Sequence, residues 1–232
     1  MSGRAVKLVV GADRGIGWSA AVALHERGDR VVAACLGDGA DLVARGIAVH
    51  REIDVTSDGS VARLLHELTA AGARLEWLFH VAGVLQLDDL QSVDFDEVRR
   101  EFEINSLGPL RVVKALAPLL DEDAKVGIVT SRVASLGDNT SGLMYAYRMS
   151  KAAANMAGLN LSHELRERGV AVLMLHPGMV ATDLTKDLGG DYATAEYITP
   201  VAAASGLIAN MNGLSLATSG RFQHSNGEYL PW

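Results

Sequence analysis

Short runs of apolar and β-branched residues alternate with longer stretches of helical periodicity along most of this chain. The apolar runs predict strands at residues 6–10, 30–35, 47–53, 75–81, 125–130 and 170–175. The longer stretches predict helices at 16–27, 95–120 and 145–168, with Pro109 as a candidate kink. Another helix is predicted where Val61, Leu64, Leu65 and Leu68 recur at i, i+3, i+4 and i+7, with Thr56 or Ser57 as its N-cap.

This alternation of strands and helices is typical of an α/β protein with a parallel sheet. Right-handed crossovers then place helices on both faces and give a doubly wound, Rossmann-like sheet. No linker-like stretch divides the chain, so residues 1–232 are expected to form a single domain. Residues 198–220 carry no charge, yet they contain Pro200, Asn210 and Gly213, which favours a buried helix and loop over a membrane span.

Composition narrows the classes of protein further. The 232 residues are 49% hydrophobic, which excludes an intrinsically disordered chain, and the net charge of −7 argues against a nucleic-acid-binding protein. Cys35 is the single cysteine, which excludes a disulfide framework and fits a reducing cytoplasm. The histidines form no cluster with metal-ligand spacing, so no catalytic metal is expected. No signal peptide is recognised at the N-terminus, and a cytoplasmic location is expected.

A glycine-rich turn follows the first predicted strand and opens the first predicted helix. Its sequence is Gly11-Ala12-Asp13-Arg14-Gly15-Ile16-Gly17. Glycines at such a place permit a tight turn and let backbone N–H groups approach a pyrophosphate, and the helix N-terminus favours the anion. The spacing differs from the commoner G-x-G-x-x-G, so on its own it is compatible with a dinucleotide site or with an ordinary connection between strand and helix.

A second motif pairs a tyrosine with a lysine on one predicted helix. Tyr147 and Lys151 are four residues apart, so the phenol and the ammonium can lie side by side on one face. A neighbouring ammonium favours the phenolate and is expected to lower the tyrosine pKa from its usual value of about 10. Such a pair could donate a proton to a carbonyl oxygen while hydride arrives at the carbon. The spacing is common by chance, so taken alone it also fits a surface pair.

Taken in order, these motifs and several others resemble the short-chain dehydrogenase/reductase family, from residue 11 to residue 183. The others are Asp54-Val55, similar to the family's adenine-contacting site; Ala82-Gly83, similar to the end of its Asn-Asn-Ala-Gly motif; Asn105 and Ser131, similar to its catalytic Asn and Ser; and Pro177-Gly178-Met179-Val180-Ala181-Thr182-Asp183, similar to the segment that closes over the nicotinamide. The resemblance implies that Asn105, Ser131, Tyr147 and Lys151 are catalytic. It implies cofactor contacts at Gly11, Arg14, Gly15, Ile16, Gly17, Cys35, Leu36, Asp54, Val55, Ala82, Gly83, Asn105, Tyr147, Lys151, Pro177, Gly178, Val180 and Thr182.

A narrower resemblance, to the C-factor and sniffer-like carbonyl reductases, rests on residues 144–153 and on residues 220–232, whose final Pro-Trp suggests a complete C-terminus. Many family members carry the catalytic serine where this chain has Ala134. Ser131 fits the longer loop of the narrower branch, and Ser135 is the alternative. Tyr145 is expected to line the substrate pocket. His80-Val81 replaces the usual Asn-Asn, so His80 either braces the strand as the first Asn does or leaves the site looser.

The choice between NADP and NAD depends on the residues that face the ribose 2′ position. An acidic residue at the end of the second strand would bind the 2′-hydroxyl of NAD, but Cys35 occupies that position. Leu36 stands where many NADP-dependent relatives carry Arg. Arg14 can clamp a 2′-phosphate, whereas Asp38 can oppose it. We expect NADP, with NAD as the less favoured alternative.

The resemblance implies an NADP-dependent oxidoreductase that transfers hydride between the nicotinamide and a carbonyl or alcohol substrate, with Tyr147 as the proton donor. Lys151 would hold the nicotinamide ribose, and Asn105 would position a water. Two alternatives stay open: a dinucleotide-binding signalling or regulatory protein with little turnover, and a related reaction such as epimerisation or dehydration. The resemblance further implies a homodimer or homotetramer built on the helices at 95–120 and 145–168, and a substrate lid at residues 184–199.

Overall fold

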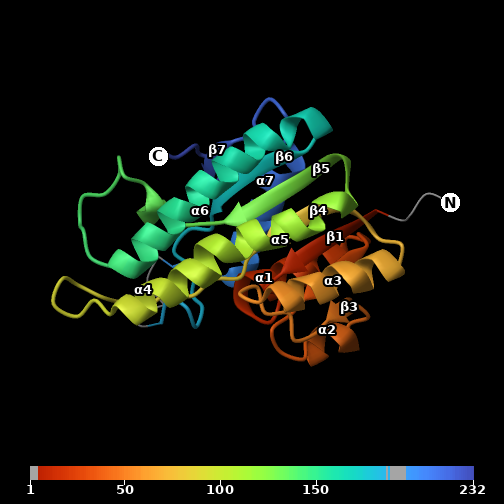
Figure 1. Ribbon diagram of the computed structural model, residues 1–232, viewed down its shortest axis with the longest axis horizontal. Coiled ribbons are helices and arrows are strands. Elements are labelled where there is room, and N and C mark those ends of the chain that lie inside the picture. Colours follow the sequence, from red (N-terminus) through yellow and green to blue (C-terminus); the bar gives the residue numbers. More distant parts are fainter. Residues whose placement is uncertain (1–4, 187, 189–196) are drawn as a thin grey trace.

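The computed structural model of the protein describes residues 5–186, 188 and 197–232, and seven of their strands form one parallel sheet (Figure 1). The strands are β1 (Ala5–Val10), β2 (Val31–Ala34), β3 (Ala48–His50), β4 (Arg74–His80), β5 (Leu120–Val129), β6 (Ala171–His176) and β7 (Arg221–His224). The helices are α1 (Gly15–Glu26), α2 (Ala40–Ala44), α3 (Asp58–Ala70), α4 (Phe95–Phe102), α5 (Gly108–Leu116), α6 (Tyr145–Glu164) and α7 (Pro200–Gly213). Short 3₁₀ or π segments are η1 (Glu103–Leu107), η2 (Ala117–Leu119), η3 (Arg132–Ala134) and η4 (Arg166–Arg168). The strand order is β3-β2-β1-β4-β5-β6-β7.

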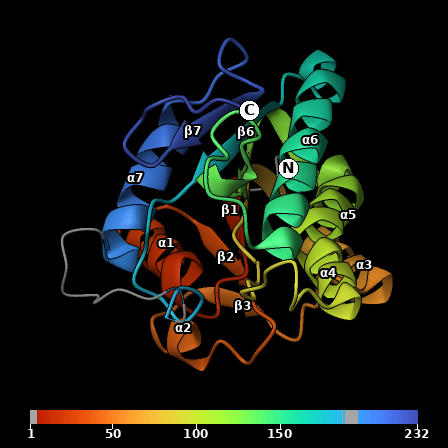
Figure 2. The same cartoon turned by 90° about the vertical axis from the view of Figure 1, so that its left-hand side faces the viewer.

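Helices cover both faces of the sheet, with α1 and α7 on one side and α3, α4, α5 and α6 on the other (Figure 2). Strands that are covered on both faces must be apolar at nearly every position, which is why β2 and β6 occur in the sequence as apolar runs and β1 is interrupted only by Lys7. The predicted α/β, doubly wound arrangement is therefore confirmed.

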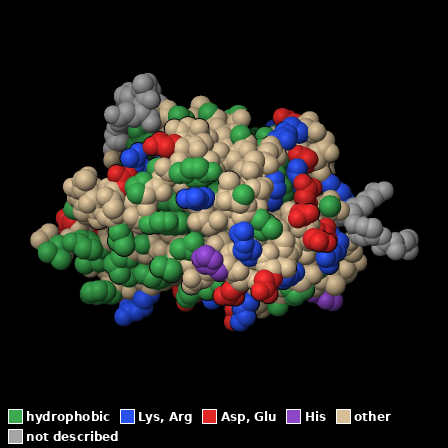
Figure 3. Space-filling model, turned by 90° about the horizontal axis from the view of Figure 1, so that it is seen from above, with side chains coloured by type: hydrophobic (Ala, Val, Ile, Leu, Met, Phe, Trp, Pro, Cys, Tyr) green, Lys and Arg blue, Asp and Glu red, His purple; other side chains and the backbone are tan. Residues whose placement is uncertain are grey.

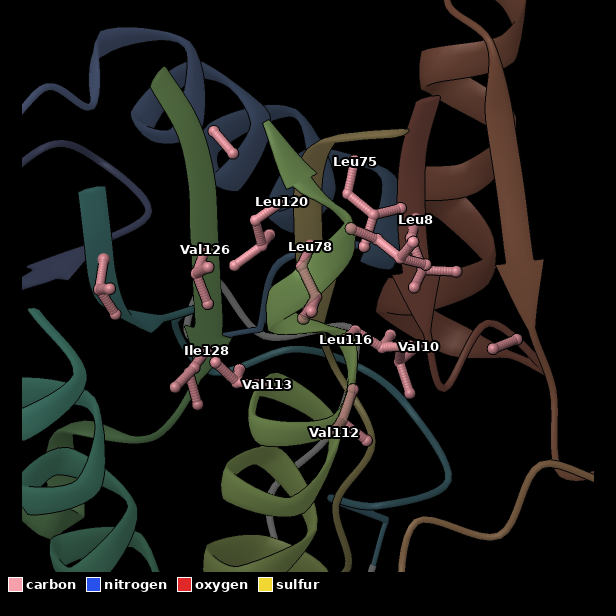
Figure 4. Packing of buried hydrophobic residues seen from close by; sticks show 14 of the residues in the cluster. Leu8, Val10, Leu75, Leu78, Val112, Val113, Leu116, Leu120, Val126 and Ile128 are labelled. Atoms are coloured by element: carbon pink, nitrogen blue, oxygen red, sulfur yellow. The ribbon is translucent and has the colours of Figure 1, made fainter. Parts of the chain in front are cut away.

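The larger of the two cores lies between the sheet and the α3–α6 layer (Figure 4). Leu8, Leu78 and Leu116 meet there and are fully buried. Val9, the neighbour of Leu8, belongs to the other core, beneath α1 and α7. This separation follows from strand geometry, because successive side chains point to opposite faces of a sheet.

The structure departs from the predicted elements in several places. The helix predicted at 95–120 is broken by the π turn η1, one turn before Pro109, and β5 already begins at Leu120. The short elements α2 and β7 were not predicted, because neither is long enough to show a period. The predicted N-cap at Ser57 is confirmed, since its side chain accepts a hydrogen bond from the N–H of Ser60.

The uncharged segment 198–220 contains α7, which is buried against the sheet through residues such as Leu207 and Met211. The prediction of a buried helix and loop is thus confirmed. Across the described ranges, no helix has both the length and the apolarity needed to cross a bilayer.

The strand order creates a crevice at one edge of the sheet. From β1 the chain turns to β2 and β3 on one side, and it then crosses over to β4 and the later strands on the other. The carboxyl ends of β1 and β4 therefore form the topological switch point, which is where ligands bind in open α/β sheets. The loops that follow β1, β4, β5 and β6 carry most of the predicted site residues to this edge.

Candidate active site

The glycine turn between β1 and α1 is packed so closely that two of its glycines have no room for a side chain. Gly11 has a φ of +83°, and a Cβ on it would lie 2.5 Å from the backbone nitrogen of Ala82. A Cβ on Gly17 would lie 2.1 Å from the carbonyl oxygen of Gly11. The first turn of α1 contains no acidic residue, so its unpaired N–H groups and positive dipole end are available to an anion. The turn thus fits a pyrophosphate.

Arg14 occupies the N-cap position of α1, and its guanidinium is exposed. Its Nη1 lies 3.6 Å from Oδ2 of Asp183, which follows β6. In the same place, a Cβ on Gly15 would lie 3.3 Å from Cγ2 of Thr182. The segment after β6 therefore reaches the glycine turn, as expected of a segment that covers a dinucleotide. Ile16, in contrast, packs on the core beneath α1.

The side chain of Cys35 does not face the expected cofactor site. Its side chain is fully buried, and its pKa is raised to about 12 by burial, Asp13 and Asp38. The alternation of side chains along β2 turns the thiol into the core beneath α1. The exposed group at this point is Leu36, whose N–H donates to the carboxylate of Asp13 at 2.9 Å, while the N–H of Gly37 donates to the same carboxylate at 2.6 Å.

A cavity of about 210 Å³ lies beside this turn. Its lining includes the carboxylate-bearing residues Asp13, Asp38 and Asp41 together with the indole of Trp18. Asp41 accepts a hydrogen bond from the Trp18 Nε1–H, which lowers the pKa of Asp41 after the stronger effect of Arg45. The region expected to hold the adenosine ribose therefore carries several negative charges.

Asp54 and Val55 lie between β3 and α3, where they are engaged by the protein itself. The carboxylate of Asp54 accepts the backbone N–H of Thr56 at 2.8 Å and its hydroxyl at 2.7 Å. Val55 is buried next to Gly108, and its carbonyl accepts a hydrogen bond from Arg111. If the Asp54 carboxylate contacts the adenine, it must do so while it also accepts the two hydrogen bonds from Thr56.

Ser131 and Tyr147 come from different elements and meet beyond the carboxyl end of β5. Ser131 directly precedes η3, and its side chain is hydrogen-bonded to the phenol of Tyr147 on α6. The alternative serine, Ser135, uses its hydroxyl to accept the N–H of Asp138 at 3.0 Å. The geometry therefore favours Ser131 over Ser135 as the partner of the tyrosine.

The electrostatics of the pair differ from the sequence expectation. Tyr147 is buried, and burial raises the pKa of its phenol above the usual value, although the hydrogen bond with Ser131 acts in the opposite direction. The expected net lowering by Lys151 is thus wrong for this structure, because desolvation dominates. Lys151 Nζ lies 5.8 Å from the phenol ring centroid and donates to the carbonyl of Val129 at 3.0 Å, and burial lowers its pKa to about 8.

Asn105 lies in the π turn η1, a local irregularity that is frequent at functional sites. Its Oδ1 accepts the N–H of Val84, and its Nδ2 donates to the carbonyl of Val84 and to the hydroxyl of Ser150. A Cβ on Gly83 would lie 3.1 Å from both Asn105 Oδ1 and Lys151 Nζ. Asn105 therefore ties the segment after β4 to α6 beside the lysine. The apolar pattern of residues 95–120 gives no sign of this turn.

Asp88 is a site residue that the motifs did not reveal. Helix α6 begins after Met144, which has no side chain able to cap it. Asp88 supplies the cap from the loop between β4 and α4: its carboxylate accepts the N–H groups of Tyr145 and Ala146, and its carbonyl accepts that of Met144. A helix start without a Ser, Thr, Asp or Asn was the only sequence signal for this contact.

Replacing Asp88 with Ala is expected to weaken the start of the helix that carries Tyr147. Loss of a helix cap costs about 0.5–2 kcal/mol of unfolding free energy, which corresponds to a fall of a few degrees in Tm for a chain of this size. We expect kcat to fall as well, because Tyr147 lies in the first turn. Chemical denaturation and steady-state kinetics measure both effects. Asp96→Ala is the matched control, since the exposed Asp96 carboxylate contacts Arg99 on its own helix and does not line the pocket, and equal losses in the two variants would contradict the assignment.

A pocket of about 440 Å³ opens beside the start of α6. Its lining is mostly apolar and consists of Leu87, Asp88, Asp89, Ser92, Ser141, Gly142, Leu143, Met144 and Leu188. Hydrophobic side chains also gather on the surface at this end of the molecule, on the left in Figure 3; Leu90 and Phe95 are exposed there. Tyr145, which is expected to line the substrate pocket, is not among the residues that line this cavity, whereas its neighbour Met144 is.

His80, which replaces an Asn of the family motif, ends β4 and is 1% exposed. Within the part of the chain that the structure describes, neither ring nitrogen has a hydrogen-bond partner. Burial, with a smaller effect of Lys151, lowers its pKa to about 3, so the ring is neutral. His80 thus does not brace the central strands through a side-chain hydrogen bond.

The parallel sheet order, the glycine turn at its switch point and the buried Ser-Tyr-Lys arrangement define the class as an α/β oxidoreductase. A sequence model of the family described as short chain dehydrogenase matches residues 5–193, and the chain belongs to that family.

Individual relatives agree with this assignment. The chain is 61% identical over 225 residues to 1-hydroxy-2-glutathionyl-2-methyl-3-butene dehydrogenase of Rhodococcus sp. (strain AD45), covering 97% of this chain and 98% of the relative. It is 44% identical over 145 residues to C-signal of Myxococcus xanthus, covering 62% of this chain and 83% of the relative.

Solved structures show the same fold. Carbonyl reductase Sniffer of D. melanogaster superposes with a TM-score of 0.87 at 24% identity, over 98% of this chain and 99% of that one. An NADPH-bound carbonyl reductase from chicken fatty liver has a TM-score of 0.85 at 25% identity, over 98% of both chains. The resemblance to C-factor is confirmed by the identity to C-signal, and the likeness to Sniffer shows a shared fold.

Proposed function

We propose that the protein is an NADP-dependent oxidoreductase that interconverts a carbonyl compound and the corresponding alcohol, with Tyr147 as the proton donor. The observation that carries this proposal is the meeting of Ser131, Tyr147, Lys151 and Asn105 beside a glycine turn that fits a pyrophosphate. A protein that only binds a dinucleotide has no need of a buried phenol and ammonium. The chain is proposed to act as one domain.

In this proposal the bound nicotinamide cofactor supplies the hydride, and the chain's own groups handle the proton. Ser131 and Tyr147 hydrogen-bond the substrate oxygen, and the Tyr147 O–H donates its proton to that oxygen. The raised pKa of Tyr147 keeps the phenol protonated until the oxygen becomes basic. Lys151 then stabilises the phenolate through its positive charge and also binds the nicotinamide ribose. Asn105 holds the segment after β4 against α6 so that these groups stay in place.

The cofactor is proposed to lie across the carboxyl ends of the strands, with its pyrophosphate at Gly11, Gly15 and Gly17. Residues Pro177, Gly178, Val180 and Thr182 would cover its nicotinamide end, since their segment already reaches the glycine turn. Val180 is held there by a parallel bridge to Ile198. NADP is preferred because a structural neighbour at 25% identity binds NADPH and because Arg14 can pair with a phosphate.

Replacing Arg14 with Gln is expected to weaken NADPH binding by a factor of about 10–100 and to leave NADH binding unchanged, because a charge-assisted hydrogen bond contributes about 1.5–3 kcal/mol. Fluorescence titration with both cofactors measures the effect. Asp38→Asn is the companion variant and should strengthen NADPH binding, since it removes a negative charge near the proposed 2′-phosphate. Equal losses of NADPH and NADH affinity in Arg14→Gln would contradict the role of Arg14, and a preference of the wild type for NADH would overturn the choice of NADP.

The substrate class is proposed from the pocket and from the Rhodococcus relative. The 440 Å³ pocket has room for a substrate with a sizeable apolar part. That relative, at 61% identity, is named as a dehydrogenase of a hydroxylated glutathionyl methylbutene. We therefore propose alcohols that carry a neighbouring thioether, and the corresponding carbonyl compounds, as the first substrates to examine.

The deciding experiment combines cofactor titration with an absorbance assay of NADPH oxidation and NADP reduction. The substrate panel contains aldehydes, ketones, quinones and glutathione-conjugated alcohols. Turnover of any of these with net consumption of cofactor supports the proposal. Binding without turnover would favour a regulatory protein, and conversion without net cofactor change would favour an epimerase or dehydratase.

Assembly and location are part of the same proposal. Leu107, Leu110, Met149 and Met156 are exposed on the helical segments η1, α5 and α6, which suits a homodimer or homotetramer built on these helices. A cytoplasmic location is proposed because the single cysteine fits a reducing compartment. No nucleic-acid or membrane partner is proposed.

The substrate lid that is expected at residues 184–199 falls largely on residues outside the described ranges.

A further inference from the structure

Glu101 is a carboxylate that the proposed reaction does not use, yet it is completely buried beside the site. It lies on α4, one helical turn before Asn105. Its Oε1 accepts the backbone N–H of Gln86 at 2.6 Å, and its Oε2 is buried with no hydrogen-bond partner among the described residues. Glutamate is almost never fully buried unless it is paired, so this position needs a physical reason.

The segment after β4 gives the first part of that reason. Asn105 and Glu101 lie one turn apart and bind the same segment, Asn105 at Val84 and Glu101 at Gln86. Two residues further on, Asp88 caps the helix that carries Tyr147. Glu101 therefore fixes the middle of a segment whose two ends contact the catalytic groups.

The charge of Glu101 gives the second part. Burial lowers the pKa of Lys151 to about 8. The negative charge of Glu101 acts in the opposite direction and favours the ammonium form of Lys151. The same charge opposes ionisation of Tyr147. Burial raises the pKa of Glu101 itself to about 7, and the charges of Asp88 and Glu97 contribute to this rise. The hydrogen bond from the Gln86 N–H and the charge of Lys151 act to lower the pKa of Glu101. His80 faces Lys151 from β4 but is neutral.

We propose that Glu101 is a positioning residue of the active site, whose carboxylate anchors the segment after β4 and supplies the negative charge that keeps Lys151 protonated. This inference rests on the proposed function, because the protonated lysine is what stabilises the Tyr147 phenolate there. A buried ammonium without a counter-charge would lose its proton near neutral pH, and the phenolate would then lose its stabilising cation.

Glu101→Gln tests the charge while preserving the side-chain volume and the oxygen that accepts the Gln86 N–H. We expect the alkaline limb of the kcat/KM profile for carbonyl reduction to move to lower pH by about one unit, as when a buried cation loses an opposite charge. Glu97→Gln is the matched control: it removes the same charge from the same helix, at a partly exposed residue paired with Arg100, and should leave the profile in place. Coincident profiles for Glu101→Gln and wild type would overturn the proposal.

A second measurement needs no substrate. The carboxyl band of Glu101 can be identified by infrared difference spectroscopy of the wild type against Glu101→Gln, and its titration followed with pH. In Lys151→Met the titration should move to higher pH, because the carboxylate loses its neighbouring cation. If it stays in place, the coupling is refuted even where no substrate has been found. If it moves but no carbonyl or alcohol is turned over, the coupling stands and the proposed function fails.

Stability gives an independent check if Glu101→Gln alters folding. A carboxyl group whose pKa rises from 4.5 to about 7 on folding binds its proton more tightly in the native state. Its contribution to the unfolding free energy is therefore fully present below pH 4.5 and is lost as the pH rises through about 7. The difference in Tm between wild type and Glu101→Gln should change across this window, and a constant difference would contradict a buried, titrating carboxyl group.

Discussion

Tyr147→Phe is expected to lower kcat by a factor of about 10²–10⁴, the range that a general acid contributes, while the affinity for NADPH stays within about twofold. The substitution removes one oxygen and keeps the ring that lies beside the Lys151 ammonium. The fold should survive, because loss of the hydrogen bond with Ser131 costs only about 1 kcal/mol of unfolding free energy. Steady-state kinetics and fluorescence titration of the same preparation separate the two effects.

The neighbouring phenol provides a matched control for this experiment. Tyr145 lies two residues earlier on α6, is exposed, and has methionine at the position four residues on, where Tyr147 has lysine. Tyr145→Phe should therefore leave kcat within about twofold of wild type, since it removes no group of the proposed proton path. Unchanged turnover in Tyr147→Phe, or equal losses in the two variants, would remove Tyr147 from the role of proton donor.

Gly17→Ala is expected to disrupt the cofactor site and to destabilise the fold. The new Cβ would lie 2.1 Å from the Gly11 carbonyl oxygen, so α1 must move away from the glycine turn. Overpacking of this kind costs about 1–3 kcal/mol, whereas the higher helix propensity of alanine returns at most about 1 kcal/mol. We expect lower stability in urea and at least about a tenfold loss of NADPH affinity, because the N–H groups of the turn lose their geometry.

Gly59→Ala separates this clash from the effect of alanine in a helix. Gly59 lies in the first turn of α3, where a Cβ would meet only the Ser57 hydroxyl at 3.9 Å. The control variant should match or exceed the stability of the wild type and bind NADPH normally. If Gly17→Ala behaved in the same way, the close packing of the glycine turn would not be what shapes the cofactor site.

Local patterns along the chain are enough to predict the class of fold and several of the site residues. The apolar runs that become β2 and β6 are continuous or nearly so because both faces of the sheet are covered, and this pattern can be recognised in the sequence. The same holds for the four-residue spacing of Tyr147 and Lys151, since a helix repeats every 3.6 residues. The glycine turn is recognisable because it directly follows a strand.

Other features depend on contacts between segments far apart in the chain. No pattern around residue 35 indicates that the Cys35 thiol lies in the core, because the face of β2 that it occupies is set by α1 and α7. The break in the helix predicted at 95–120 follows from Asn105 reaching Val84 and Ser150. The spacing of apolar residues within a helix does not show which residues of other segments a side chain will contact.

The sequence by itself therefore determined the alternation of the longer strands and helices, the class of fold and the residue types available for proton and hydride transfer, but not the short elements α2 and β7. The tertiary structure decided the burial, the hydrogen-bond partners and the charged neighbours of those residues. It buried Tyr147 and Lys151, brought Ser131 rather than Ser135 to the phenol, and placed Asp88 and Glu101 near the helix that carries Tyr147. The physical reason is that desolvation and charge depend on distance in space, which the spacing of residues along the chain specifies only within a few helical turns.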